Sequence, residues 1–123
     1  MNENIKQTER GWAGHFCGAM NCKFRRNTLL EHNEIKIVVS SVGLWIDPEN
    51  RNGYIPVWDN KHYFETKAFY ANLEDTRYYD ISNNEISIKS EHYIDEIDAD
   101  DRANIMHDHI VEEIKQRMIE NTI

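Results

Sequence analysis

Acidic residues gather near the C-terminal end of the chain, where residues 91–113 hold nine carboxylates and a single base, Arg102. A carboxylate-rich surface can dock on a basic protein surface, and long-range attraction makes that docking fast and sensitive to salt. A solvated helix start is the simpler interpretation of the same residues. We expect a basic partner protein to be bound by the first part of this cluster, namely Glu91, Tyr93, Asp95, Glu96, Asp98, Asp100 and Asp101.

A short basic segment, Lys23-Phe24-Arg25-Arg26, offers the opposite chemistry. In a strand, alternation places Lys23 and Arg25 on one face and Phe24 and Arg26 on the other. Basic residues beside an aromatic ring can bind phosphate and stack a nucleic-acid base. The alternative function is therefore a small nucleic-acid or nucleotide-binding module that uses Arg25 and Arg26. Charges that keep sheets from aggregating are the simpler interpretation.

Histidine and cysteine residues suggest a weaker site. His15 and Cys17 point to one face if they lie in a strand, and Cys22 could approach across a turn, which gives three possible ligands for Zn²⁺. The spacing lacks paired Cys-x-x-Cys ligands and a fourth ligand, so we predict no metal. His107 and His109 lie about 200° apart around a predicted helix. We interpret both as surface histidines.

Signatures of catalysis are missing from the sequence. There is no Gly-x-Ser-x-Gly motif, and Ser40-Ser41 interrupts an apolar, strand-like run. No phosphate-binding or dinucleotide-binding glycine motif is present, and Arg51 occupies the place of an oxygen ligand in the calcium-loop-like segment 47–53. We therefore expect a protein that is not an enzyme and uses no cofactor.

Composition limits the class of protein. The chain has 123 residues, 40% of them hydrophobic, and a net charge of −8, which suits one soluble globular domain and opposes a broad nucleic-acid surface. The 70 residues from position 54 onward carry a net charge of −9, so the acidity is concentrated there. We interpret the two cysteines as reduced thiols. The absence of an apolar leader predicts a cytoplasmic protein, in the host cell if a phage encodes it.

Strand signals dominate the first 90 residues. The β-branched run 35–45 has apolar side chains on both faces, which is typical of an inner strand covered on both sides. Residues 22–31 are its expected hairpin partner, 47–53 form a turn, and 62–73 form another strand. Asn83-Asn84 is predicted to be a hairpin turn between strands 77–82 and 85–89.

A helical period replaces the strand pattern at the C-terminus. Ala103, Met106, Ile110, Ile114 and Met118 recur at three- and four-residue steps. Asp98, Asp100 and Asp101 stand where an N-cap and first turn belong. We predict an α+β fold: an antiparallel sheet of about four to six strands with one C-terminal amphipathic helix over 98–121. Residues 1–123 form a single domain, with a flexible N-terminal segment over 1–10.

Several segments resemble a family of small proteins encoded in phages and prophages. The resemblance is carried by TERGWAGHF (8–16), CKFRRNTLLE (22–31), VVSSVG (38–43) and YFETKAF (63–69). It implies a phage or prophage accessory protein. Small acidic proteins of that origin often block host defences, including CRISPR–Cas. By this analogy we expect a non-catalytic inhibitor of a host defence protein; the oligomeric state stays open, including a homo-oligomer.

Overall fold

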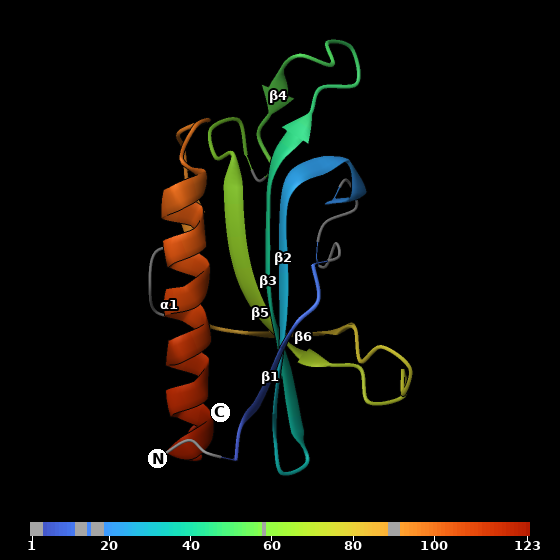
Figure 1. Ribbon diagram of the computed structural model, residues 1–123, viewed down its shortest axis with the longest axis vertical. Helices are drawn as coiled ribbons and strands as arrows, with labels where there is room; N and C mark the ends of the chain where they lie inside the picture. Colours follow the sequence, from blue (N-terminus) through green and yellow to red (C-terminus); the bar gives the residue numbers. More distant parts are fainter. Residues whose placement is uncertain (1–3, 12–14, 16–18, 58, 89–91) are drawn as a thin grey trace.

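One antiparallel sheet and one helix make up the computed structural model, which describes residues 4–11, 15, 19–57, 59–88 and 92–123 (Figure 1). The predicted α+β class with one C-terminal helix is confirmed. The sheet has seven strands, more than expected, because two of them are only two residues long. The elements are β1 (Lys6–Glu9), the 3-10 turn η1 (Ala19–Asn21), β2 (Cys22–His32), β3 (Ile35–Ile46), β4 (Tyr54–Ile55), β5 (Phe64–Ala71), β6 (Ile81–Ile86), β7 (Tyr93–Ile94) and α1 (Asp100–Ile119).

The strand order β1-β2-β3-β5-β6 places β3 at the centre of the sheet, as its apolar faces predicted. β2 and β3 form the expected long hairpin, with Thr28 opposite Val39. Its turn at Asn33 has φ 57°, a conformation that Asn tolerates better than most residues. The short strands extend the ends of the long ones: β4 pairs with β3, and β7 pairs with β5.

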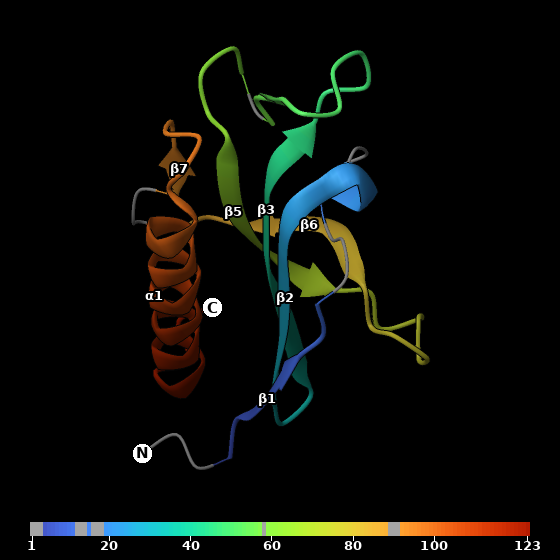
Figure 2. The ribbon, with the colours of Figure 1, turned by 45° about the horizontal axis from the view of Figure 1, so that its top comes forward.

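The helix covers one face of the sheet (Figures 1 and 2). Its predicted apolar stripe packs on the strand residues that point toward it, and the largest core cluster results. The buried members of that cluster are Leu30, Ile37, Val39, Ala68, Ile86, Ile110, Val111, Ile114 and Met118. Phe64 belongs to a second cluster under the start of the helix, where Gly43 in β3 is required because a Cβ atom at its position would lie 2.3 Å from the ring of Phe64.

The opposite face of the sheet has smaller apolar clusters, and no α-helix of the described residues covers it. One joins Leu29, Val38 and Ala71 with the half-buried Tyr79 and Ile81. A second joins Cys22, Val42 and Val57. Between them the central strands present the buried polar residues Asn27, Ser40 and Glu65.

Three expectations about the elements are wrong in part. The predicted flexible segment 1–10 includes β1, which pairs along β2 from Lys6 to Glu9. Asn83 and Asn84 lie within β6 and form no hairpin turn. The turn lies earlier, over residues 72–80, where Asp75 accepts hydrogen bonds from the amides of Tyr78 and Asp80. The helix begins two residues later and ends two residues earlier than predicted.

Candidate functional site

The predicted carboxylates between β7 and the first turn of α1 lie on the surface. Asp95, Glu96, Asp98, Asp100 and Asp101 are all exposed, and we call these five residues the acidic end. Glu96 pairs with Arg102, its Oε1 lying 3.1 Å from Nη1, but both side chains are more than half exposed. Within the described ranges the other four carboxylates have no ion-pair partner among lysine, arginine and histidine side chains. The acidic end is thus open to a partner.

Part of this negative charge stabilises the helix. Asp100 and Asp101 lie in the first turn of α1, where carboxylates interact favourably with the positive end of the helix dipole. The residue at the N-cap is Ala99, which makes no side-chain hydrogen bond. The expectation that Asp98 caps the helix is therefore wrong. Asp95 and Asp98 have no such structural role within the described residues.

We call residues 91–113 the acidic window, and its remaining described carboxylates are paired along the helix. Asp108 accepts a hydrogen bond of 2.8 Å from Arg26, and Glu112 lies 3.1 Å from Lys115. Glu113 lies 3.8 Å from Arg117. The window thus divides into a mostly unpaired N-terminal part and a C-terminal part whose carboxylates are paired, although Asp108 and Glu112 stay largely exposed. The unpaired charges of the N-terminal part are the ones available to a partner. Glu91 lies outside the described residues.

An apolar pocket of about 300 Å³ adjoins the acidic end. It lies where β7 meets α1, and Tyr93, half-buried, is one of its walls. Burial, and then the nearby Glu65 carboxylate, raise the pKa of Tyr93, so its phenol stays neutral at physiological pH. The side chain of Ile105 is 69% exposed at the pocket. The lining residues are Tyr93, Ile94, Arg102, Ile105, Met106 and His109.

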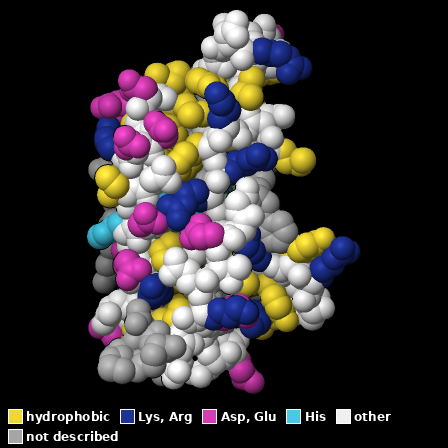
Figure 3. All heavy atoms as spheres, in the orientation of Figure 1, with side chains coloured by type: hydrophobic (Ala, Val, Ile, Leu, Met, Phe, Trp, Pro, Cys, Tyr) yellow, Lys and Arg dark blue, Asp and Glu magenta, His cyan; other side chains and the backbone are white. Residues whose placement is uncertain are grey.

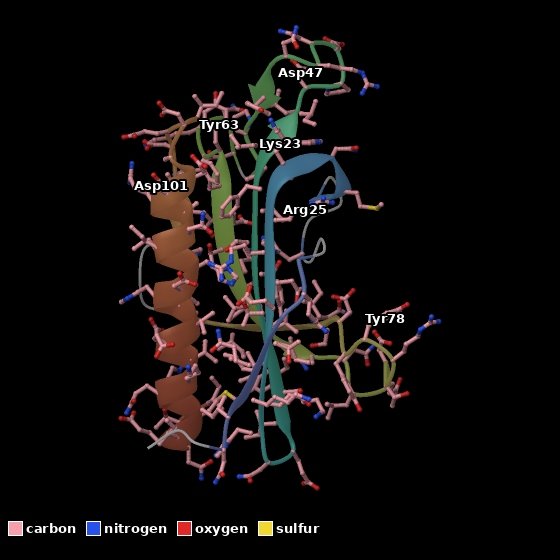
Figure 4. The ribbon with its side chains drawn as sticks, viewed as in Figure 1. Lys23, Arg25, Asp47, Tyr63, Tyr78 and Asp101 are labelled. Atoms are coloured by element: carbon pink, nitrogen blue, oxygen red, sulfur yellow. The ribbon has the colours of Figure 1, made fainter. Side chains whose placement is uncertain are left out.

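Figure 3 shows acidic side chains gathered over the first turns of α1, next to hydrophobic ones. Ile97, which lies between Glu96 and Asp98 of the acidic end, is a second exposed aliphatic residue. Exposed aliphatic groups beside unpaired charges are typical of contact surfaces, where the apolar part supplies affinity and the charges supply orientation. Asp101 lies in the first turn of α1, far from the loop that carries Tyr78 (Figure 4).

The basic segment does not form a joint surface. Phe24 is buried and packs edge-on against Phe64, with ring centroids 5.2 Å apart, so it cannot stack a base. Arg26 is held by Glu9 and Asp108 on the helix side. Only Lys23 and Arg25 are exposed; Arg25 lies on the side of β2 away from α1 (Figure 4). At the alternative nucleic-acid site of Arg25 and Arg26, the ring of Phe24 is therefore inaccessible to a nucleobase, and Arg26 is already paired with carboxylates.

His107 is fully buried, so its interpretation as a surface histidine is wrong, whereas His109 is exposed. The side chain of His107 packs on the sheet between Thr28 of β2 and Ser41 of β3. Thr28 Oγ1 lies 2.8 Å from Nε2, and Ser41 Oγ lies 2.6 Å from Nδ1. Ser41 Oγ is also 2.6 Å from Thr66 Oγ1. A histidine on the buried side of the helix thus links α1 to β2 and β3 directly and, through Ser41, to β5.

For a neutral imidazole, the hydrogens in this cluster have one consistent arrangement. Thr28 donates its hydroxyl hydrogen to the Glu9 carboxylate, so its oxygen accepts from His107 Nε2–H. His107 Nδ1 then accepts from Ser41, whose oxygen accepts from Thr66. This arrangement requires a neutral imidazole. Burial, and then the charge of Arg26, lower the pKa of His107 to about 4, which agrees with it.

A second histidine cluster lies on the opposite face of the sheet. His15, from the connection between β1 and β2, places Nδ1 2.8 Å from Ser40 Oγ and Nε2 2.7 Å from Glu65 Oε1. The side chains of His15 and Glu65 are both almost fully buried. Serine, histidine and carboxylate in series resemble a nucleophile with its base. Ser40, however, has no exposed surface, so its hydroxyl cannot meet a substrate in this conformation.

The His15 cluster leaves two buried polar atoms without a hydrogen-bond partner in the described part of the chain. They are Glu65 Oε2 and Asn27 Nδ2. Asn27 stands directly opposite Ser40 in the β2–β3 register. Its Oδ1 accepts a hydrogen bond of 2.8 Å from Arg10, which also donates to the backbone oxygens of Tyr78 and Tyr79.

The metal hypothesis at His15, Cys17 and Cys22 gains no support. Cys17 lies outside the described residues, and both ring nitrogens of His15 contact protein groups. Cys22 is buried, and burial raises the pKa of its thiol to about 11, which disfavours the thiolate that binds zinc. Among the residues that the structure describes, no three His, Cys, Asp or Glu side chains form a group suited to a metal ion.

Sequence reasoning missed the pocket and both polar clusters. The one available signal was the pair Ser40-Ser41 inside an apolar strand, where two hydroxyls need partners on opposite faces. Which partners they meet depends on the registers of β2 and β5 and on the position of α1, and no local pattern specifies these.

Comparisons with protein-family models, with curated proteins and with solved structures found no match to this chain. Over the described ranges, no helix has both the length and the apolar character that crossing a membrane requires.

Proposed function

We propose that this protein is a non-catalytic inhibitor that binds a basic surface of a host defence protein through its acidic end and the adjoining pocket. The observation that supports this most directly is the coexistence of exposed, unpaired carboxylates with the exposed side chain of Ile105. Inhibition is steric: the bound domain covers a surface that the partner needs.

Charge and apolar contact have different roles in this proposal. Each exposed ion pair contributes only about 0–1 kcal/mol, so the carboxylates mainly accelerate association and orient the two proteins. Most of the affinity comes from burial of Ile97, Ile105 and the pocket walls, at roughly 25 cal/mol per Å² of apolar surface before the costs of association. Salt therefore slows association more than it speeds dissociation.

The class of partner is inferred from the resemblance to small phage and prophage proteins. A phage accessory protein gains from blocking a defence system that acts on nucleic acid, and the proteins of such systems carry basic surfaces for that purpose. A component of a CRISPR–Cas system is the most specific form of the proposal. An acidic surface competes with nucleic acid for such a partner.

The experiment measures plaquing of a targeted phage on bacteria that carry an active CRISPR–Cas system and express this protein. We expect the protein to raise the efficiency of plaquing. The triple variant Asp95→Asn/Glu96→Gln/Asp98→Asn should lose this effect. The matched control Glu34→Gln/Glu49→Gln/Glu74→Gln, which removes three exposed charges elsewhere, should retain it.

Two outcomes would contradict the proposal. Equal activity of the two triple variants would exclude the acidic end as the contact. No increase in plaquing by the wild-type protein, with the protein folded and abundant in the cells, would exclude inhibition of the defence system tested.

A further inference from the structure

The pocket beside the acidic end has a lining and a rim that together select one kind of occupant. We propose that it holds a single aliphatic side chain from a partner segment that has lysine or arginine on both sides of that side chain. This inference rests on the proposed function and specifies the partner sequence that the surface recognises.

The size of the pocket favours a side chain over a larger molecule. Its volume of about 300 Å³ is at the lower end of the range for small-molecule sites. Two aliphatic side chains and a methionine line it, and the neutral ring of Tyr93 adds a flat wall. Methionine adapts its shape to an incoming group, which suits a pocket that receives different aliphatic residues.

The rim of the pocket is acidic. Asp101 lies one helical turn before Ile105, so its carboxylate and the exposed isoleucine are neighbours on α1. Arg102 lines the pocket, but Glu96 balances its charge. Asp101 then leaves this part of the rim with excess negative charge, and Asp95 and Asp98 lie on the segment that joins two of the pocket walls, Ile94 and Arg102. An aliphatic residue that enters the pocket therefore brings its sequence neighbours close to carboxylates, and lysine or arginine fits there best.

The same charges exclude other occupants. Phosphate groups of nucleic acid and the headgroups of anionic lipids would be repelled by the acidic end. A neutral apolar segment could enter the pocket but would gain nothing from the rim. The favoured partner is therefore a protein segment in which one aliphatic residue has basic residues on both sides.

The test uses fluorescent peptides and the full-length protein. The probes are Arg-Lys-Leu-Lys-Arg, the same peptide with glycine in place of leucine, and Glu-Glu-Leu-Glu-Glu, and binding is measured by fluorescence anisotropy at low salt. We expect the leucine peptide to bind at least about tenfold more tightly than the glycine peptide, because burial of one leucine side chain is worth that much. The acidic peptide should not bind.

Two exposed positions give matched variants. Ile105→Ser removes the aliphatic group at the pocket and should abolish the preference for leucine. Leu73→Ser removes a similarly exposed side chain on the loop between β5 and β6 and should change nothing. Amide shifts in NMR spectra of the protein with the leucine peptide should concentrate at Tyr93, Ile94 and residues 102–109.

Each of three other outcomes would overturn this inference, and each has a different consequence for the proposed function. Equal binding of the leucine and glycine peptides, lost at high salt, would exclude the pocket but keep the acidic contact. No binding of any basic peptide would exclude this partner sequence, while the plaquing experiment still decides the function independently. Self-association that Ile105→Ser abolishes would show that the pocket holds a second copy of this chain instead.

Discussion

Ser40 and Ser41 are neighbours in β3, and their side chains leave the sheet on opposite faces, where each meets a different histidine. On the helix face, Ser41 contacts His107, whose two ring nitrogens both have hydroxyl partners. On the other face, Ser40 contacts His15 beside Glu65 and Asn27, each of which leaves one buried polar atom without a described partner. One strand thus supports a complete polar network and an incomplete one.

The difference reflects what each histidine attaches to the sheet. His107 lies within a 20-residue helix whose position is also fixed by a large apolar cluster, so its hydrogen bonds form in a well-defined geometry. His15 comes from a connection between strands, on the face with the smaller apolar clusters. A buried network that is fully satisfied rigidifies a fold, whereas one with unpaired atoms costs free energy. We therefore expect the two clusters to respond differently to substitution and to pH.

The largest effect should come from removal of the imidazole on the helix face. His107→Ala leaves a cavity and deprives Thr28 and Ser41 of a partner, so the free energy of unfolding should fall by about 3 kcal/mol. The exposed neighbour provides the control: His109→Ala should change it by less than about 0.5 kcal/mol. Urea denaturation measures both values, and a similar small loss in the two variants would show that the His107 cluster contributes little.

Acid should affect the same cluster. Because the pKa of His107 is about 4 in the folded protein and 6.5 in the unfolded chain, the unfolded state binds the extra proton between these values. Stability is therefore lost as the pH falls through this range, by about 2 kcal/mol at pH 5 relative to pH 7.5. The measured quantity is the difference in pH dependence between the wild type and His107→Gln. Parallel stability curves for the two proteins would contradict the assignment.

The elements of the fold followed from local patterns far better than these clusters did. The stripe from Ala103 to Met118 predicted the helix, and the β-branched run of β3 predicted its central place, because both signals lie within one element. The partners of His107 lie 79 and 66 residues away, at Thr28 and Ser41. These two residues contact His107 only because of the strand registers and the position of α1 on the sheet, and sequence spacing specifies neither.

The acidic end shows a similar division. Exposure of Asp95, Glu96, Asp98, Asp100 and Asp101 was predicted correctly, because a dense group of carboxylates cannot be buried without cations. The pairing of Asp108 with Arg26 was not foreseen, since β2 and α1 are remote in sequence. The pocket at Tyr93 was missed for the same reason, because β7 and α1 form it together.

The adjacent serines allow the two faces to be compared directly. Ser41→Ala removes a hydroxyl that bonds both His107 and Thr66, and it should cost about 2 kcal/mol. Ser40→Ala removes one bond to His15 and should cost about 1 kcal/mol. Both serines are buried in one strand, so each variant serves as the control for the other in chemical denaturation. Equal losses would show that the two networks are energetically alike.

The smallest effect should come from the unpaired amide. Asn27→Leu removes a buried donor that has no partner in the described residues, and the gain offsets the lost hydrogen bond from Arg10, so stability should change by less than about 0.5 kcal/mol. Its neighbour Thr28, on the helix face, bonds both His107 and Glu9, and Thr28→Val should cost about 2 kcal/mol. Thermal unfolding of the two variants measures the contrast. A large loss for Asn27→Leu would mean that the Asn27 amide makes a stabilising contact after all. Glu65 Oε2 would then be the one described atom that makes the network around His15 less complete than the one around His107.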